Sequence, residues 1–375
     1  MNGEIPEALP SVITDAMVAE ASNRPQSNDR KARIGFIGIG WWATSNHIPV
    51  LKLRSDIELV CACGLDETVN KKVQNDFGFD ETTTDYEELL EHQLDGVVIA
   101  SPHPWHGPHA IAALNAGCHV YVEKPFATKV EDAREIVRIA NDYGMQLVVS
   151  HGWHYRPLTK KAKALMKEGL VGEVEHVVCH MASPGGKGLF SGESFEYTGS
   201  YMPIEVKTYS DPITSEGGYG QGQLSHALGL LIWLTGLDPK AVFAKMSQVG
   251  SQVDMYDAIT ATFKNGAIAT ISGAAALPDA ARYQMDMRIF GSEGMLNFDI
   301  DRERVDLYRH DGEHRLLDVG KDEGAYLCDG PLHNFVELIL GLDDTNLSPG
   351  YCGLRAVELL DAAYRSSRSG LEEKC

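Results

Sequence analysis

The sequence predicts an α/β protein with two domains: a doubly wound parallel sheet covered by helices, then an α+β domain with a mostly antiparallel open sheet. Short apolar runs alternate with amphipathic helical segments over residues 33–153, which is typical of a parallel sheet with crossover helices. Beyond residue 234, within the second domain at 154–350, several β-like runs follow one another without helices between them, which favours antiparallel pairing. The length of 375 residues also exceeds what one hydrophobic core normally supports.

The first domain is predicted to contain five strands with helices between them. Each expected strand is a short apolar run, and the first of them ends in glycines. The strands are expected at 33–38, 57–63, 96–100, 119–123 and 146–150, and helices after Asp66, at 109–116 and at 130–143. One more helix is expected at Thr84-Asp85-Tyr86-Glu87, which matches a capping box.

The second domain is predicted to mix helices with hairpin-connected strands. Its elements are expected at 158–168 (helix), 174–181 (strand), 224–234 (apolar helix), 257–263 and 267–272 (strands), and 354–366 (helix). The last two strands are joined by Lys264-Asn265-Gly266, an Asn-Gly turn signal. The polar stretch 183–216 is too long for a plain connection, so it is expected to be functional or mobile.

Both ends of the chain are predicted to lie outside the two sheets. Residues 1–32 are polar and irregular, and we expect a disordered tail there. They contain neither the basic start nor the apolar run of a secretory signal. Residues 351–375, with the helix at 354–366, are expected to pack back on the first domain.

Composition limits the partners. The formal net charge is −20 and no basic patch interrupts it, so the sequence predicts neither a nucleic-acid partner nor an anionic membrane surface. No apolar stretch reaches the roughly 20 residues that a membrane-spanning helix needs. The seven cysteines are scattered and odd in number, which favours free thiols in a reducing compartment. We therefore expect a cytoplasmic protein.

A glycine-rich turn follows the first predicted strand. Gly38-Ile39-Gly40-Trp41-Trp42-Ala43 has the form G-x-G-x-x-A and precedes a helix. Glycine permits a tight turn and a close approach of the backbone to a pyrophosphate, and the helix N-terminus then faces the negative charge. In this context the turn predicts a Rossmann domain that binds a nicotinamide dinucleotide.

The end of the second strand normally contacts the adenosine ribose. Gly64 stands at that point, with no carboxylate at the strand tip and no arginine nearby to bind a 2′-phosphate. Asp66 lies two residues later and is interpreted as a helix cap. The absence of a basic residue favours NAD, and NADP stays open as the alternative.

A charged pair closes the fourth expected strand, at Glu123-Lys124 before Pro125. A lysine at the carboxyl end of a sheet strand lies where the chemistry of this fold takes place, and partial desolvation lowers its pKa toward proton transfer. The alternative is an ordinary surface ion pair.

A histidine series follows the third expected strand. His103, His106 and His109 are spaced like metal ligands, but Pro104, Gly107 and Pro108 argue against a shared helical face. No metal site is therefore predicted there.

At this point the chain resembles the Gfo/Idh/MocA oxidoreductases, the glucose–fructose oxidoreductase and inositol dehydrogenase family. The similar segments are 35–40, 113–125, 171–174, Gly217-Gly218 with 231–236, and 353–357, so the resemblance runs from residue 33 to about residue 366. It implies hydride transfer between nicotinamide and a secondary hydroxyl of a sugar, glycoside or cyclitol, with Lys124 beside both. It also implies assembly through the second sheet, and we expect a homodimer or homotetramer.

The resemblance also implies a second catalytic motif, an aspartate and a histidine four apart on one helix face. His226 occupies the histidine position, and the aspartate position holds Gly222. The expected role of His226 is to accept the proton of a substrate hydroxyl that Lys124 positions. The carboxylate that would orient the imidazole is missing, and Gln221 and Gln223 on either side cannot ionise.

Further site residues are expected from their places in this pattern. The expected cofactor contacts are Gly38, Ile39, Gly40, Trp41, Trp42, Gly64, Ser101, Pro102, His103, His106, Glu123 and Lys124, and the expected substrate contacts are Tyr155, Arg156, Tyr219 and Gln223. Tyr155 and Arg156 have an equal alternative as anchors of the domain junction. The aromatic residues Phe195, Tyr197, Tyr201 and Tyr209 suit sugar stacking, and a loop packed on its own aromatics is the alternative.

Two rival functions stay open. One is an enzyme that cleaves glycosides by transient oxidation and keeps a tightly bound NAD. The other is a non-catalytic regulator that senses a sugar or a dinucleotide; Gly222 favours it, and intact Glu123-Lys124-Pro125 with His226 argues against it.

Overall fold

The computed structural model describes residues 13–197, 199–278 and 280–375. Its first domain is a six-stranded parallel sheet in the order β3-β2-β1-β4-β5-β6. The strands are β1 Ala32–Ile37, β2 Ile57–Cys63, β3 Glu81–Thr83, β4 Gly96–Ile99, β5 His119–Val122 and β6 Leu147–Val149. The strand order reverses between β1 and β4, so ligands are expected beyond the carboxyl ends of these two strands.

Helices cover this sheet, as the alternating pattern predicts. They are π-helix η1 Ala43–His47, α2 Ile48–Leu51, α3 Glu67–Phe77, α4 Tyr86–Leu90, 3-10 helix η2 His103–Trp105, α5 His106–Asn115 and α6 Val130–Tyr143. The sequence missed β3, because its Glu-Thr-Thr strand contains no apolar residue. The capping box was also misplaced: the N-cap of α4 is Asp85, whose carboxylate accepts the Glu87 N–H, and not Thr84.

The second domain is a nine-stranded sheet in the order β14-β13-β12-β11-β7-β10-β9-β8-β15. Its strands are β7 Val174–Pro184, β8 Pro239–Ser247, β9 Tyr256–Phe263, β10 Ile268–Leu277, β11 Gln284–Gly291, β12 Gly294–Asp299, β13 Arg304–Arg309, β14 His314–Leu316 and β15 Glu373–Lys374. β7 and β10 run parallel, and the other neighbouring strands that the structure describes run antiparallel. The mostly antiparallel sheet of the prediction is confirmed.

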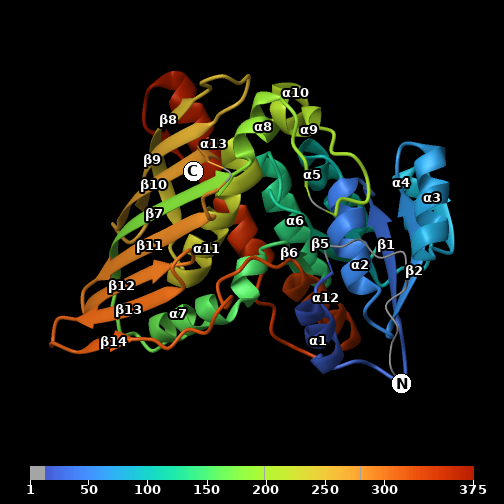
Figure 1. Ribbon diagram of the computed structural model, residues 1–375, viewed down its shortest axis with the longest axis horizontal. Coiled ribbons are helices and arrows are strands. Elements are labelled where there is room, and N and C mark those ends of the chain that lie inside the picture. The colour runs from blue at the N-terminus through green and yellow to red at the C-terminus, as the bar shows by residue number, and fades with distance from the viewer. Residues whose placement is uncertain (1–12, 198, 279) are drawn as a thin grey trace.

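One face of this sheet is covered by helices and carries the core of the second domain. The covering helices are α7 Pro157–Lys167, α11 Ser225–Thr235 and α13 Gly350–Ser369, which lie to the right of the sheet in Figure 1. Side chains on the other face remain open to solvent, among them Phe243, Tyr256, Ile268 and Tyr308.

We therefore predict that the protein assembles into a dimer or tetramer through the open face of the second sheet. Exposed aromatic and aliphatic side chains on a broad sheet favour burial against a second copy. Light scattering should return a multiple of the 41.0 kDa chain mass. A monomer mass across a wide concentration range would refute this assembly.

The expected disorder of residues 1–32 is wrong for the part that the structure describes, and residues 1–12 lie outside it. Helix α1 spans Asp15–Asn23 and is capped by Thr14, whose hydroxyl accepts the Met17 N–H. Met17 is buried against the first domain, and Arg24 pairs with Glu337 on α12 (Asp329–Leu340). The Arg24–Glu337 pair joins residues 313 positions apart, which local polarity could not reveal.

The carboxyl-terminal segment packs on both domains rather than on the first alone. Helix α13 contacts α6 and β6 of the first domain and α11 and β8 of the second. The chain then ends in β15, which pairs with β8 at the sheet edge.

None of the helices in the described ranges is both long enough and apolar enough to cross a membrane.

The long stretch 183–216 is structured and joins the two domains. It contains α8 Gly186–Ser191, α9 Lys207–Ser210 and α10 Pro212–Ser215. Between α8 and α9 the chain leaves the second domain, passes beside α2 and returns (Figure 1).

Candidate active site

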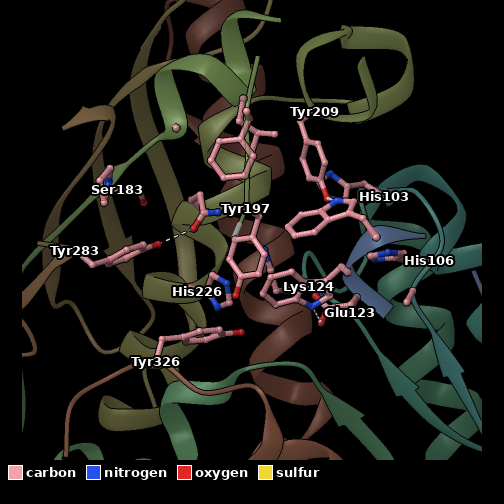
Figure 2. A pocket seen from close by; sticks show the side chains of 18 of the residues that line it. His103, His106, Glu123, Lys124, Ser183, Tyr197, Tyr209, His226, Tyr283 and Tyr326 are labelled. Carbon is pink, nitrogen blue, oxygen red and sulfur yellow. Dashed lines mark hydrogen bonds between the residues drawn. The ribbon is translucent and has the colours of Figure 1, made fainter. Parts of the chain in front are cut away.

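A cavity of about 270 Å³ lies between the domains, at the carboxyl edge of the parallel sheet. Figure 2 shows three groups of side chains around it. The first domain contributes Trp41, Trp42, Ala100, Ser101, His103, His106, Glu123 and Lys124; the second contributes Trp153, Ser183, Pro184, Gly186, Leu189, Gln223, His226, Tyr283 and Tyr326; the connection after α8 contributes Phe195, Tyr197 and Tyr209. Residues from both predicted functional motifs thus meet in one space.

The dinucleotide loop has the backbone that a pyrophosphate site needs. Gly38 has φ +92°, and a Cβ there would lie 2.4 Å from the Ser101 nitrogen, so this position requires glycine. A Cβ on Gly40 would meet nothing within 4 Å, which leaves the space above the turn open. Helix η1 starts directly afterwards with no side-chain cap on its N-terminus. These features fit a bound dinucleotide whose pyrophosphate faces the loop.

Close packing of neighbouring side chains leaves room only for glycine at the end of β2. A Cβ on Gly64 would lie 2.5 Å from Asn70 Oδ1 and 2.7 Å from Ile39, so glycine is needed for close contact here. Asp66 caps α3, because its carboxylate accepts the N–H groups of Thr68 and Val69.

Glu123 is a buried hub that holds other site residues. Its Oε1 accepts hydrogen bonds from Trp42 Nε1 (3.0 Å), His47 Nε2 (2.7 Å) and Ser150 Oγ (2.5 Å), and its Oε2 accepts the Lys124 N–H (3.0 Å). Burial by itself raises the pKa of this carboxyl, but the hydrogen bond and charge of His47 and the charge of Lys124 lower it to about 2. Both oxygens of this ionised group are engaged by the protein, so its role is to fix Trp42 and the lysine backbone.

Lys124 reaches across the domain boundary. Its Nζ donates a hydrogen bond to the backbone carbonyl of Gly222, at 2.9 Å. Burial lowers the pKa of Lys124, and the charge of Glu123 partly opposes this. The ammonium therefore sits in the cavity wall with a neutral acceptor as its nearest partner, which eases proton release.

His226 stands on α11, at the cavity. Its ring packs on the edges of Trp153 (5.2 Å between centroids) and Tyr326 (5.3 Å). Burial lowers its pKa well below the usual value, and the charge of Lys124 adds to this. At neutral pH the imidazole is uncharged and can accept a proton.

The position of the family aspartate is closed by a phenylalanine. Gly222 lies in a π-helix, η4 Gly220–Leu224, which widens the turn before α11. A Cβ on Gly222 would lie 2.8 Å from Cζ of Phe190, whose ring is buried. Phe190 thus fills the space that a longer residue at 222 would use.

The second domain lines its side of the cavity with hydrogen-bonded polar side chains. Gln223 Oε1 accepts a 2.6 Å hydrogen bond from the Tyr283 hydroxyl, and both side chains line the cavity. Ser183 Oγ lies 2.9 Å from the Tyr219 hydroxyl. Tyr219 itself is fully buried behind this wall, so the structure does not bring it to the cavity.

Several other expected contacts also lie away from the cavity. The Tyr155 hydroxyl donates to Asn334 Oδ1 (2.8 Å), and Arg156 Nη2 donates to the Asp322 carbonyl (3.0 Å). The Tyr155 contact fits the alternative of a domain-junction anchor, because Asn334 belongs to α12, which packs against strands of the first domain. Pro102 is exposed before η2 and does not line the cavity.

The histidine series is dispersed. The ring nitrogens of His106 lie 2.6 Å from the Pro125 carbonyl and 2.7 Å from the Ser101 carbonyl, so this ring ties two loops together. His109 Nδ1 lies 3.0 Å from Ser101 Oγ, while His103 lines the cavity. Within the described ranges no three His, Cys, Asp or Glu side chains gather as a metal site.

Sequence reasoning missed part of the site. The missed residues are His47, Phe190, Trp153, Tyr283 and Tyr326. Of these residues, His47 lies nearest to the glycine-rich turn, four residues after Ala43, so that motif could have drawn attention to it. Tyr283 and Tyr326 come from segments with no chemical motif, so no local signal could have found them.

Solved structures share this architecture. Levoglucosan dehydrogenase in complex with NADH aligns with a TM-score of 0.74 at 18% identity, over 92% of this chain and 99% of that chain. GenD2 from gentamicin A biosynthesis, in complex with NAD, aligns with a TM-score of 0.72 at 23% identity, over 94% and 98%. At these identities the likeness establishes the fold.

The family is established by sequence models. Residues 32–151 match the model described as "Oxidoreductase family, NAD-binding Rossmann fold". This match defines the chain as an NAD-binding oxidoreductase-type protein. Residues 159–297 match the "GFO/IDH/MocA C-terminal domain". The chain belongs to the Gfo/Idh/MocA oxidoreductase family, as the sequence motifs predicted.

Curated relatives match over part of their length. D-glucoside 3-dehydrogenase of Escherichia coli (strain K12) is 32% identical over 180 residues, 46% of this chain and 51% of the relative. The oxidoreductase YdgJ of the same strain is 34% identical over 149 residues, 40% and 42%. A glycosyl hydrolase family 109 protein of Stenotrophomonas maltophilia (strain K279a) is 28% identical over 182 residues, 44% and 40%. The chain spans about half or less of the length of these relatives.

Proposed function

We propose that the protein is a dehydrogenase that oxidises a secondary hydroxyl of a neutral glycoside or related sugar, with NAD or NADP as hydride acceptor. The carrying observation is that Lys124 and His226 line the same cavity as Trp41 and Trp42 of the dinucleotide loop. The similarity to D-glucoside 3-dehydrogenase supports a glycoside as the substrate class.

The residues divide the proton chemistry between them. A bound nicotinamide supplies the acceptor for the hydride that leaves the substrate carbon. Lys124 donates a hydrogen bond to the substrate hydroxyl oxygen, and the uncharged His226 accepts the hydroxyl proton. Loss of that proton and of the hydride leaves a carbonyl. While the proton leaves and before the hydride has gone, Lys124 stabilises the negative charge that develops on the oxygen.

The charge of the cavity indicates a neutral substrate. Among the described residues that line it, Glu123 and Lys124 carry the formal charges, and both are engaged within the protein. Burial lowers the pKa of His103 to about 3 and that of His226 well below normal, so neither supplies a cation. Lys124 is the one cation among these lining residues, and it is already assigned to the reacting hydroxyl, so the charge of a uronate or a sugar phosphate would find no second cation to pair with.

The test is a screen for formation of reduced nicotinamide, with both cofactors and matched sugars. Neutral alkyl and aryl glucosides should be oxidised with a higher kcat/KM than the corresponding glucuronides and 6-phosphates. Turnover of only charged sugars would contradict the assigned charge preference. No oxidation of any sugar, glycoside or cyclitol would refute the proposed function.

A second candidate is glycoside cleavage by transient oxidation, which the similarity to the glycosyl hydrolase family 109 protein supports. Cofactor consumption separates the two functions. A dehydrogenase reduces one nicotinamide per sugar oxidised, whereas cleavage by transient oxidation releases the aglycone with no net reduction.

Cofactor binding itself gives a third prediction. Gly40→Val should lower the affinity for the dinucleotide by at least about tenfold, or about 1.4 kcal/mol, because the side chain fills the space above the loop. The melting temperature without cofactor should change little, since a Cβ here meets no protein atom within 4 Å. Calorimetric titration with NAD and NADP measures the affinity. Unchanged binding in the variant would contradict the assigned site.

A further inference from the structure

A segment of the second domain closes around the dinucleotide loop. We call residues 195–197 and 199–209 the clasp. It follows α8, passes beside α2 of the first domain and returns through α9 (Figure 1). Its aromatic side chains contact the first domain at two places, one inside the cavity and one outside it.

The inner contact covers the variable residues of the glycine motif. Trp41 Nε1 donates a 3.0 Å hydrogen bond to the Tyr209 hydroxyl, and the ring of Tyr209 packs edge-on against His103 at 5.7 Å. The ring of Tyr197 lies 5.4 Å from that of Trp41 and 6.1 Å from that of Trp42. Figure 2 shows Tyr209 above Lys124 and beside His103, and Tyr197 to the left of Lys124.

The outer contact is made by Tyr201 and lies away from the catalytic groups. Its hydroxyl accepts a hydrogen bond from Lys72 Nζ (2.6 Å) and donates one to Asp76 Oδ2 (2.5 Å). Its ring packs 4.9 Å from that of Phe77, with the Lys72 ammonium 3.9 Å from the ring centre. Its main-chain N–H donates to Ser45 Oγ on η1 (2.9 Å). An exposed ion pair alone is weak, but here an aromatic ring and a main-chain hydrogen bond add to it.

We propose that the clasp is the outer wall of the dinucleotide site and that the Tyr201 anchor slows the release of the bound dinucleotide. The pyrophosphate would face Gly38, Gly40 and the start of η1, and the clasp contacts this region twice, at Trp41 before the helix and at Ser45 within it. Departure of the dinucleotide therefore requires the clasp to lift. Opening of such a segment adds to the dissociation barrier and slows release. The proposal rests on dinucleotide binding and not on the substrate.

The test is the dissociation rate of NADH from the full-length holoprotein. The loss of energy transfer from tryptophan to bound NADH is followed after mixing with excess NAD. Tyr201→Ala removes the ring and the hydroxyl, and Tyr201→Phe removes the hydroxyl alone. The matched control is Tyr143→Ala, because Tyr143 is 60% exposed on α6.

We expect dissociation to be slowest in the wild type and the Tyr143→Ala control, faster in Tyr201→Phe, and faster by at least about tenfold in Tyr201→Ala. Equal rates in the wild type and Tyr201→Ala would overturn the proposal and leave the clasp as a tether between domains. If Tyr201→Ala fails to fold, the dissociation rates of Tyr201→Phe and Asp76→Asn test the proposal instead. Wild-type rates in both of these variants would overturn the proposal. No sugar enters the measurement, so its outcome is independent of the proposed reaction.

Discussion

Lys124→Met should reduce turnover by about 10²–10⁴-fold, the range typical of proton-transfer groups, while the fold and dinucleotide binding persist. Methionine nearly preserves the volume of the lysine stem and deletes the ammonium that donates to the Gly222 carbonyl. Steady-state kinetics on the best glycoside of the screen, with calorimetric titration of the cofactor, separates the loss of chemistry from a loss of binding.

The matched control for this variant is Lys129→Met, which removes an exposed ammonium at the start of α6 and should leave turnover unchanged. His226→Ala should also lower kcat, and the double variant should be little worse than the poorer single variant, because groups that act on one proton are not additive. Equal kinetics in the wild type, Lys124→Met and His226→Ala on every oxidised substrate would contradict the catalytic assignment.

Gly222→Asp should destabilise the protein by about 1–3 kcal/mol and lower its activity, rather than restore the family's catalytic pair. The new Cβ would lie 2.8 Å from the Phe190 ring, and overpacking of a buried site has a cost of this size. The strain would also displace the carbonyl that accepts the Lys124 hydrogen bond. Thermal unfolding and kinetics on small and large glycosides measure the two effects.

Two variants separate crowding from charge at this position. Gly222→Ala introduces the same Cβ without a carboxylate, so it should reproduce most of the loss of stability. In the double variant Gly222→Asp with Phe190→Leu, the free-energy loss should be smaller than the sum of the single losses, since the two sites touch. A stable, more active Gly222→Asp single variant would show that Phe190 does not close this position.

Much of the first domain was predictable because its signals are local. The apolar strands and the glycine turn lie within contiguous runs, and the φ of +92° at Gly38 confirms why glycine stands there. The same reasoning failed at β3, whose polar strand is recruited by pairing with β2, and at α1, whose burial depends on α12 at the other end of the chain.

The sequence motifs identified some residues of the candidate site, but not which other side chains surround them. Lys124 and His226 were found from their segments, and both line the cavity. Tyr155, Arg156 and Tyr219 come from neighbouring segments and still point elsewhere, since the direction of a side chain depends on packing that no motif records. The functional roles of all these residues await the variants described above.

The sequence by itself determined the Rossmann domain, the dinucleotide loop and the strand that ends in Glu123 and Lys124, because each is encoded within one short stretch. Only the tertiary structure decided what these groups meet. The Gly222 carbonyl lies 98 residues from Lys124, and Tyr201 lies 125 residues from Asp76. Periodicity reports which face of a segment is buried, but the identity of its neighbour follows from how the two domains pack together.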